Sequence, residues 1–274
     1  LNVTFTGHTL VVLGDPHGQF APIEDQHRME QWEGLWDSRF MCDLCGCLRI
    51  TLSKFRRQAA DGRPLDFRHF QFVGSLYPKH GVPLVEAVAH ARGRYPAAGQ
   101  LFFGTTLCIT HKCRVFVNSM VNSALARSDA VFVPAVHECW RKDANQPQDM
   151  RVWTGIVLIA RCGSKEKHLK NGVRYKLLAI TSESDSDDDE PASPNFEMTA
   201  VDDEDKPLGT SFVLTIQELG SKMRLSHAIT YFSSQARTIH DGLRLAQTSS
   251  KLFTLRHLIV GLGRGPIGAD IQVE

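Results

Sequence analysis

The chain has 274 residues, of which 42% are hydrophobic and 22% charged. This composition is typical of a globular protein with one large domain or two smaller ones. The longest apolar runs, such as residues 10–13 and 155–160, fall well short of the roughly 20 residues of a membrane helix. An odd number of cysteines, seven, argues against a secreted disulfide framework. We therefore expect an intracellular protein of the nucleus or cytoplasm, with reduced thiols and no signal peptide or transmembrane segment.

The net charge of +1 hides a strong segregation of charge. Residues 182–205 hold 11 acidic and no basic side chains, so the other 250 residues carry a surplus of 12 positive charges. A basic surplus of this size suits a polyanionic partner, because neutralised phosphates release counterions; a solvated basic surface explains the charge equally well. The acidic segment predicts a disordered loop over residues 182–206.

The first half of the chain has an α/β pattern. Residues 9–14 form a short apolar run ended by Gly14-Asp15-Pro16, which predicts a buried strand followed by a loop. From residue 24 to residue 150 helical and strand-like patterns mix, as in an α/β layer fold. The clearest are two amphipathic helical patterns at 86–94 and 115–127, and a strand-like run at 107–110.

The second half begins with a β-rich stretch. Residues 151–181 carry β-type runs on both sides of an Asn171-Gly172 turn signal, which predicts a small antiparallel barrel or hairpin module. After the acidic segment the α/β character returns. There we expect one apolar strand that runs into Ser233-Ser234-Gln235 and a second that ends at Arg264.

Two short segments near the carboxyl end carry a family resemblance. Residues 231–238 read Tyr-Phe-Ser-Ser-Gln-Ala-Arg-Thr, and residues 259–265 read Ile-Val-Gly-Leu-Gly-Arg-Gly. They resemble the fifth and sixth motifs of superfamily 1B DNA helicases, which include the RecD-like, Dda-like and replication-associated enzymes. The resemblance implies an α/β fold: the second RecA-like domain of a P-loop NTPase, a parallel sheet with flanking helices and a small β-barrel insertion.

The resemblance also implies residue roles. In the sixth motif Arg264 would be an arginine finger that stabilises charge on the transferred phosphoryl group. In the fifth motif Gln235 would face the nucleotide. Thr230, Ser234 and Thr238 would contact the nucleic-acid backbone.

Several positions depart from the family pattern. Phe232 and Ser233 replace His and Lys, and Ala236 replaces a Gly, which removes the residue that most readily takes a positive φ. Gly263 and Gly265 stand where the family has larger residues, and we expect them to loosen the loop that aims Arg264.

Two upstream segments resemble the third and fourth motifs. Residues 11–23 are similar to Gly-Asp-x-x-Gln-Leu-x-Pro, with one extra residue, and the resemblance makes Asp15 and Gln19 nucleotide-facing; read without it, Gly-Asp-Pro is only a turn. Residues 52–58 resemble the fourth motif, in which an Arg before Gln touches a phosphate. Arg57 holds that position, with Arg56 as the alternative, and its planar fork suits phosphate oxygens.

The resemblance divides the chain into five parts. They are the end of a first RecA-like domain with the third motif (1–23), the first part of a second RecA-like domain with the fourth motif (24–150), a β-barrel-like insertion that helps guide single-stranded DNA (151–181), an acidic disordered loop (182–206) and the rest of the second domain with the last two motifs (207–274).

The sequence contains no Gly-x-x-x-x-Gly-Lys-Ser/Thr P-loop, and no Asp-Glu pair follows an apolar strand before Asp15. We therefore expect the C-terminal part of a helicase that binds ATP and Mg²⁺ only together with an upstream P-loop-bearing domain. Single-stranded DNA or another nucleic acid is the expected partner. Two alternatives stay open: a catalytically inactive nucleic-acid-binding relic, and an interaction module that acts through the acidic loop.

Other motifs point to weaker hypotheses. Residues 263–268 spell Gly-x-Gly-x-x-Gly, but only six residues follow, too few for a dinucleotide-binding unit. Cys42, Cys45 and Cys47 could begin a zinc site, yet thiols packed on helices explain them better. We predict no metal site.

Overall fold

The computed structural model describes residues 39, 42, 66–77, 80–137, 147–167, 169–182 and 193–274. The third and fourth motifs, with Asp15, Gln19 and Arg57, lie outside these residues. Among the described helices, none is both long and apolar enough to cross a membrane.

A parallel sheet organises one end of the described structure. Its strands are β1 (Thr105–Cys108), β9 (Ala228–Thr230), β10 (Leu243–Leu245) and β11 (Ile271–Val273), in the order β11-β10-β1-β9. The registers place Leu107 beside Ile229 on one side and beside Leu245 on the other. All neighbouring pairs are parallel, so the carboxyl ends of the four strands meet at one edge.

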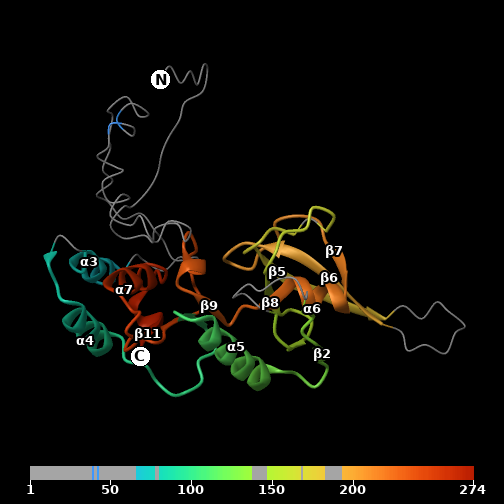
Figure 1. The fold of residues 1–274 in the computed structure, drawn as a ribbon, viewed down its shortest axis with the longest axis horizontal. Coiled ribbons are helices and arrows are strands. Elements are labelled where there is room, and N and C mark those ends of the chain that lie inside the picture. Colours follow the sequence, from blue (N-terminus) through green and yellow to red (C-terminus); the bar gives the residue numbers. More distant parts are fainter. Residues whose placement is uncertain are drawn as a thin grey trace, which may run out of the picture.

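Helices cover both faces of this sheet, because alternate strand residues point to opposite sides. Leu107, Ile229 and Leu243 pack with α3 (Phe67–Ser75), α4 (Leu84–Arg94) and α7 (Leu255–Leu262). On the other face, Cys108 of β1, Ala228 of β9 and Ala246, which follows β10, pack against Cys113 and Val117 of α5 (His111–Leu125). The result is a three-layer α/β arrangement, visible at the left of Figure 1.

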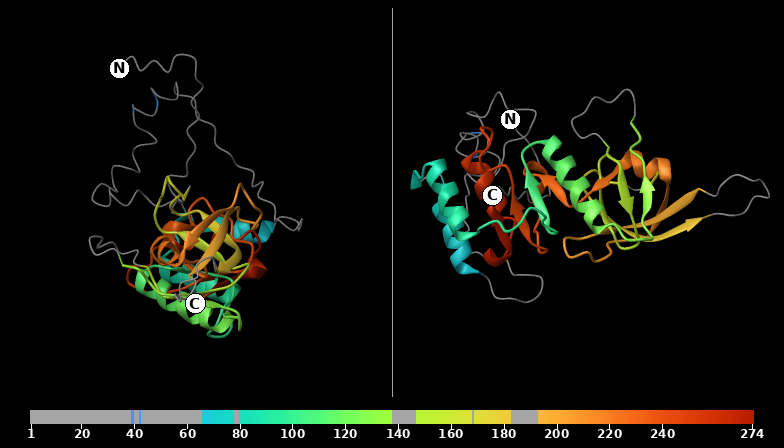
Figure 2. Two further views of the ribbon diagram at one scale, coloured as in Figure 1. Left: turned by 90° about the vertical axis from the view of Figure 1, so that its right-hand side faces the viewer. Right: turned by 90° about the horizontal axis from the view of Figure 1, so that it is seen from below.

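An antiparallel module occupies the other end. Strands β4 (Val157–Ala160), β5 (Arg174–Ser182), β6 (Pro194–Val201), β7 (Phe212–Thr215) and β8 (Met223–Leu225) form a five-stranded sheet in the order β7-β6-β5-β4-β8. Helix α6 (Ile216–Lys222) and the two-stranded pair β2 (Val131–Val133) and β3 (Met150–Val152) complete it. Figure 2 shows β5 and β6 projecting away from the parallel sheet.

The module has its own apolar core. Leu158, Leu177, Phe196 and Met198 are all 0% exposed within it. The predicted turn before β5 is present: Gly172 has a φ of 80°, and the Val173 amide donates to the Lys170 carbonyl at 3.1 Å. The predicted fold class, a parallel sheet with flanking helices joined to a small antiparallel β module, is confirmed.

Three expectations need correction. The second apolar strand, expected to end at Arg264, is helix α7, whose apolar residues Leu255, Leu258, Ile259 and Leu262 recur at helical spacing. Part of the loop expected at 182–206 is strand β6, because Phe196, Met198 and Ala200 alternate into the module core. The antiparallel sheet therefore continues beyond residue 181, through β6, β7 and β8.

Cysteine usage also differs from expectation at one position. Cys42 is in a disulfide, whereas Cys108, Cys113 and Cys162 are free thiols. The expectation of reduced thiols is therefore wrong for Cys42. The weaker zinc hypothesis also loses Cys42 as a ligand, because a sulfur bonded to another sulfur is not a thiolate. The described part of the chain contains no group of three or more His, Cys, Asp or Glu side chains able to hold a metal ion.

Candidate functional site

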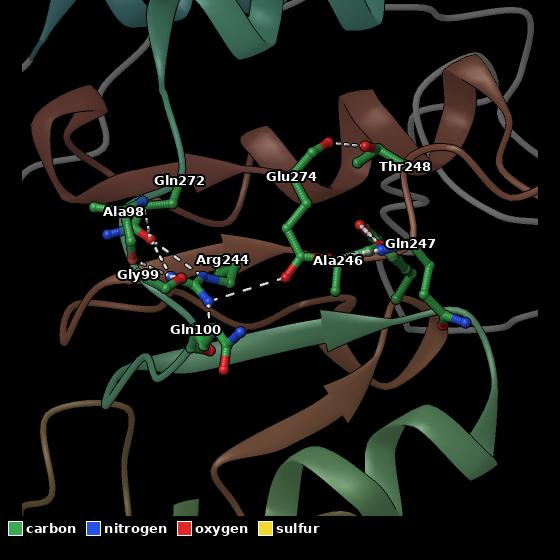
Figure 3. Close-up of polar contacts among 10 residues, drawn as sticks. Ala98, Gly99, Gln100, Arg244, Ala246, Gln247, Thr248, Gln272 and Glu274 are labelled. Carbon is green, nitrogen blue, oxygen red and sulfur yellow. Dashed lines mark hydrogen bonds and ion pairs between the residues drawn. The ribbon is translucent and has the colours of Figure 1, made fainter.

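The loops that leave the carboxyl ends of the parallel strands are tied together by one glutamine. Gln247 follows β10 with a φ of 59°, and its Oε1 accepts from the amides of Ile109 at 2.9 Å and Thr110 at 3.2 Å. Figure 3 shows Gln247 and Thr248 beside Glu274, the last residue after β11. This edge, where α/β sheets commonly bind ligands, is thus held by polar contacts between three strand ends.

In the same sheet, a buried arginine of β10 links this strand to β11 and to the segment before β1. Arg244, 4% exposed, donates to Gln272 Oε1 at 2.6 Å and to the carbonyls of Ala98 and Gln100 at 2.7 and 3.1 Å. Figure 3 shows its guanidinium enclosed by these groups. Because its donors meet acceptors, this buried cation has the compensation that burial requires.

The residues of the predicted fifth motif begin in a tight turn after β9, the 3₁₀ helix Phe232–Ser234. Ser233 Oγ lies 2.9 Å from Thr230 Oγ1, which also accepts from the Ser233 amide at 3.2 Å. Ser234 is 0% exposed, and its hydroxyl donates to the Tyr231 carbonyl at 2.7 Å. The Thr230 and Ser234 hydroxyls are therefore used within the turn, and a nucleic-acid contact would require them to leave these partners.

The next two residues behave differently. Gln235 Nε2 is buried, and among the described residues it has no hydrogen-bond partner. Ala236 is exposed and has a φ of 62°, a left-handed backbone conformation that glycine adopts most readily. The turn therefore has a positive φ at an alanine and leaves an amide donor of Gln235 unsatisfied among the described residues.

Arg264 joins the last two motifs. Its Nε donates to the Val260 carbonyl at 3.1 Å and its NH1 to the Arg237 carbonyl at 3.4 Å. The Ile239 amide donates in turn to the Arg264 carbonyl at 2.9 Å. The side chain is 6% exposed, so in this conformation the guanidinium faces protein carbonyls.

The glycines around Arg264 pack closely. A Cβ on Gly265 would lie 2.8 Å from Ile271 Cδ1, and one on Gly263 would lie 3.1 Å from the Ile259 carbonyl oxygen. Gly263 is also the C-cap of α7, with its amide bonded to the Ile259 carbonyl. The expectation that these glycines loosen the loop is wrong, because Gly265 allows close contact with Ile271 of β11 and Gly263 caps α7.

A cleft of about 260 Å³ lies between the amino ends of β1 and β9 and the antiparallel module. Trp153, Arg174, His227, Arg237 and Thr238 are among the residues that line it. It therefore brings Thr238 of the fifth motif next to aromatic and charged side chains of the module.

Charges in this cleft are largely balanced within the protein. Arg174 NH2 lies 2.7 Å from Asp205 Oδ1, and the Thr238 amide donates to Asp203 Oδ2 at 2.8 Å. Burial lowers the pKa of Arg237, and the nearby Asp203 carboxylate opposes this shift. With a carboxylate near each arginine, the cleft offers little net charge to an anion.

His227 differs from the two arginines of this cleft in its hydrogen bonding. Its Nε2 is buried and has no hydrogen-bond partner within the described part of the chain. Burial lowers the pKa of His227 to about 4, so the ring is neutral at pH 7. A neutral imidazole can donate or accept one hydrogen bond here, which suits a polar group of a ligand.

Of the predicted site residues, Thr230, Ser234, Gln235, Thr238 and Arg264 fall in one continuous region formed by the turn after β9 and the end of α7. Sequence reasoning missed His227, Arg237 and Gln247. Arg237 stands inside the fifth-motif stretch and Gln247 directly follows a strand, so both had a local signal, whereas only the fold reveals the burial of His227.

Comparisons with solved structures find helicases. The chain is similar to the Pif1 helicase from Candida albicans, with 15% sequence identity, a TM-score of 0.48 and coverage of 76% of this chain and 53% of that chain. It is also similar to a Pif1 helicase from Bacteroides in complex with ADP-AlF3 and ssDNA, with 13% identity, a TM-score of 0.45 and coverage of 76% and 49%. The chain thus spans about half the length of these helicases.

No protein-family model and no curated protein sequence matches the chain.

Proposed function

We propose that the chain is the C-terminal part of a superfamily 1B-like DNA helicase. It supplies the second wall of a nucleotide cleft, and the complete enzyme couples ATP hydrolysis to movement on single-stranded DNA and to duplex unwinding. A P-loop-bearing first domain would bring the phosphate cradle and the Mg²⁺ site. In this chain Gln235 and Arg264 would face the nucleotide, together with Asp15, Gln19 and Arg57.

One observation supports this proposal most. The segments that carry the fifth and sixth motifs are separate in sequence, yet Arg264 donates to the carbonyl of Arg237 in the fifth motif, and the amide of Ile239, the residue after that motif, donates to the Arg264 carbonyl. A helicase that couples nucleotide binding and hydrolysis to its contacts with nucleic acid needs these two segments to be in contact.

The test mixes this chain with a P-loop-bearing first domain and measures ATP hydrolysis with and without single-stranded DNA. We expect DNA-stimulated hydrolysis that falls by roughly 10³-fold or more in Arg264→Ala, the range lost with an arginine finger. Arg264→Lys keeps the positive charge but loses the bidentate guanidinium, so we expect hydrolysis in this variant to fall nearly as far. Arg127→Ala removes an exposed arginine beside Asp129 and serves as the control.

Because Arg264 is buried, each variant is also checked by thermal unfolding. A folded Arg264→Lys protein with unchanged hydrolysis in the mixture would contradict the finger role. If the chain binds single-stranded DNA but no first domain restores hydrolysis, the catalytically inactive relic is the better description. The bonding of the Arg264 guanidinium to protein carbonyls favours that alternative.

A further inference from the structure

A buried arginine that has no counter-charge among the described residues lies where the two halves of the molecule meet. Arg114, in the first turn of α5, is 0% exposed. Its Nε, NH1 and NH2 have no hydrogen-bond partner among the residues that the structure describes. Arginine keeps its charge in proteins, so five buried N–H donors have no acceptor in the described part of the chain.

Helix packing fixes the direction of this side chain. Asn118, one turn later on the same face of α5, donates to the carbonyls of Leu225 and Ala228 at 3.4 and 3.1 Å. The side-chain Oδ1 of Asn118 also accepts from the Ala228 amide at 2.7 Å. This face of α5 therefore lies against the link between β8 and β9, and Arg114 lies on that face.

Two more buried arginines stand at this junction. Arg161 directly follows β4 and is 6% exposed, with NH1 bonded to the Ser221 carbonyl at 2.6 Å. Arg224, in β8, is 4% exposed and pairs in register with Ile159 of β4. Burial lowers the pKa of Arg224 to about 9, and the charges of Arg114, Arg237 and Arg161 add to this shift.

The surroundings of Arg114 contain no compensating carboxylate in the described part of the chain. Burial lowers its pKa, Arg161 lowers it further, and only the Cys108 thiol acts in the opposite direction. Arg244, equally buried, shows the contrast, because it bonds to Gln272 and to three backbone carbonyls. The fold thus satisfies Arg244 internally, whereas Arg114 has no acceptor among the residues that the structure describes.

We propose that a phosphate-type oxyanion binds to Arg114 at the contact of α5 with β8, with Arg161 and Arg224 supplying further positive charge. A planar guanidinium donates to two oxygens of one phosphate at once, so this ligand matches the missing acceptors. Since Arg114 is fully buried, binding includes an opening of the contact between α5 and β8. The source of the phosphate group is either a nucleic-acid backbone or a free phosphate.

The test follows thermal unfolding of the full chain as inorganic phosphate replaces chloride at constant ionic strength. For the wild type we expect a saturable rise in Tm, because a ligand that binds only the folded state stabilises it. Arg114→Met should lose this rise, Arg114→Lys should keep only part of it, and Arg244→Met should keep it. In chloride, Arg114→Met should be at least as stable as the wild type, because it removes a buried cation that has no partner.

Two results would overturn the proposal. An equal rise in Tm for the wild type and Arg114→Met would show the general stabilising effect of phosphate on folded proteins. A loss of stability in chloride as large for Arg114→Met as for Arg244→Met would show that the Arg114 guanidinium is already satisfied. Arg114→Lys guards against misfolding of the Met variant.

A second measurement identifies the source. Binding of a fluorescent oligothymidylate is followed across a salt series, with inorganic phosphate as competitor. If phosphate competes with the oligothymidylate, and if Arg114→Met reduces the salt dependence of DNA binding by the equivalent of about one phosphate contact, the site binds a nucleic-acid backbone. If Arg114→Met leaves the salt dependence of DNA binding unchanged but loses the rise in Tm with phosphate, the site binds a free phosphate. A chain that binds no DNA but keeps the phosphate response retains this site and loses only the proposed helicase function.

Discussion

Ala236 holds a backbone conformation that costs alanine energy. Its φ of 62° lies in the left-handed region, where a Cβ crowds the following carbonyl at a cost of about 1–2 kcal/mol. Glycine takes this conformation without that cost, although it loses more entropy on folding. The turn after β9 therefore imposes its shape on an unfavourable residue.

We predict that Ala236→Gly stabilises the folded chain by about 1 kcal/mol, which denaturant unfolding can measure. Ala126→Gly is the matched control. Ala126 has a φ of −58°, so glycine there should destabilise by about 0.5–1 kcal/mol through its unfolded-state entropy. A less stable Ala236→Gly protein would show that the turn is not strained.

His227 predicts a pH dependence of stability. Burial lowers the pKa of His227 to about 4 from its ordinary 6.5. Between these two pKa values the imidazole is protonated in the unfolded chain and neutral in the folded chain. The neutral, buried His227 therefore favours the folded state fully above about pH 6.5, and this stability is lost as the pH falls from 6.5 towards 4. Burial lowers the pKa of His257 to about 4 as well, so two groups contribute.

We expect His227→Gln to lose less stability between pH 7 and pH 5 than the wild type, measured by denaturant unfolding at several pH values. His90→Gln, at an exposed position of α4, controls for the removal of an imidazole. Parallel pH curves for wild type and His227→Gln would exclude burial of this imidazole as a source of acid sensitivity.

At the scale of elements, α7 shows how a cap decides between helix and strand. Residues 255–262 are mostly apolar, and such a run fits a buried strand or a buried helix. Thr254 accepts from the His257 amide, and the Thr254 amide donates to His257 Nδ1, so both ends of a capping box are present. This local signal, with helical spacing of leucines, selects the helix.

Removal of this cap should destabilise the chain. We predict a loss of about 1 kcal/mol in Thr254→Ala, measured by urea unfolding, because the first-turn amide loses its acceptor. Thr254→Ser keeps the hydroxyl and should lie close to the wild type. Equal losses in both variants would mean that packing of the Thr254 methyl group, and not the cap, is responsible.

Strand β6 lies inside a segment that charge alone predicts to be a disordered loop. Its apolar side chains alternate with acidic and polar ones, which gives the strand a period of two. The net charge summed over residues 182–205 does not reveal this alternation. Pairing with β5 and β7 then buries Phe196 and Met198 completely. Charge averaged over 24 residues is therefore a poor guide to an individual strand.

For the whole molecule, Arg237 is a direct link between the two sheets. Its Nε donates to the Ser233 carbonyl at 3.0 Å in the turn after β9, and its NH2 donates to the Gly172 carbonyl in the turn before β5. One side chain thus connects the parallel sheet to the antiparallel module. Relative motion of the two halves must break at least one of these hydrogen bonds.

We predict that Arg237→Met destabilises the chain by about 2 kcal/mol, the scale of a lost charge-assisted hydrogen bond, and speeds amide exchange at residues 170–173. Calorimetry and hydrogen exchange measure the two effects. Arg151→Met, at an exposed position of β3, should change neither. Unchanged exchange at this turn would mean that other contacts hold the module in place.

The sequence by itself determined the α/β class and the first part of the antiparallel module with its Asn-Gly turn, because each depends on local periodicity or on a short pattern. Only the tertiary structure decided that the last two motifs are in contact, that Ser234 and Arg264 turn inward to protein carbonyls, that Ala236 has a glycine-like φ, and that Arg114 is buried without an acceptor among the described residues. These features depend on which elements pack against one another, since burial and hydrogen-bond satisfaction are set by neighbours distant in sequence.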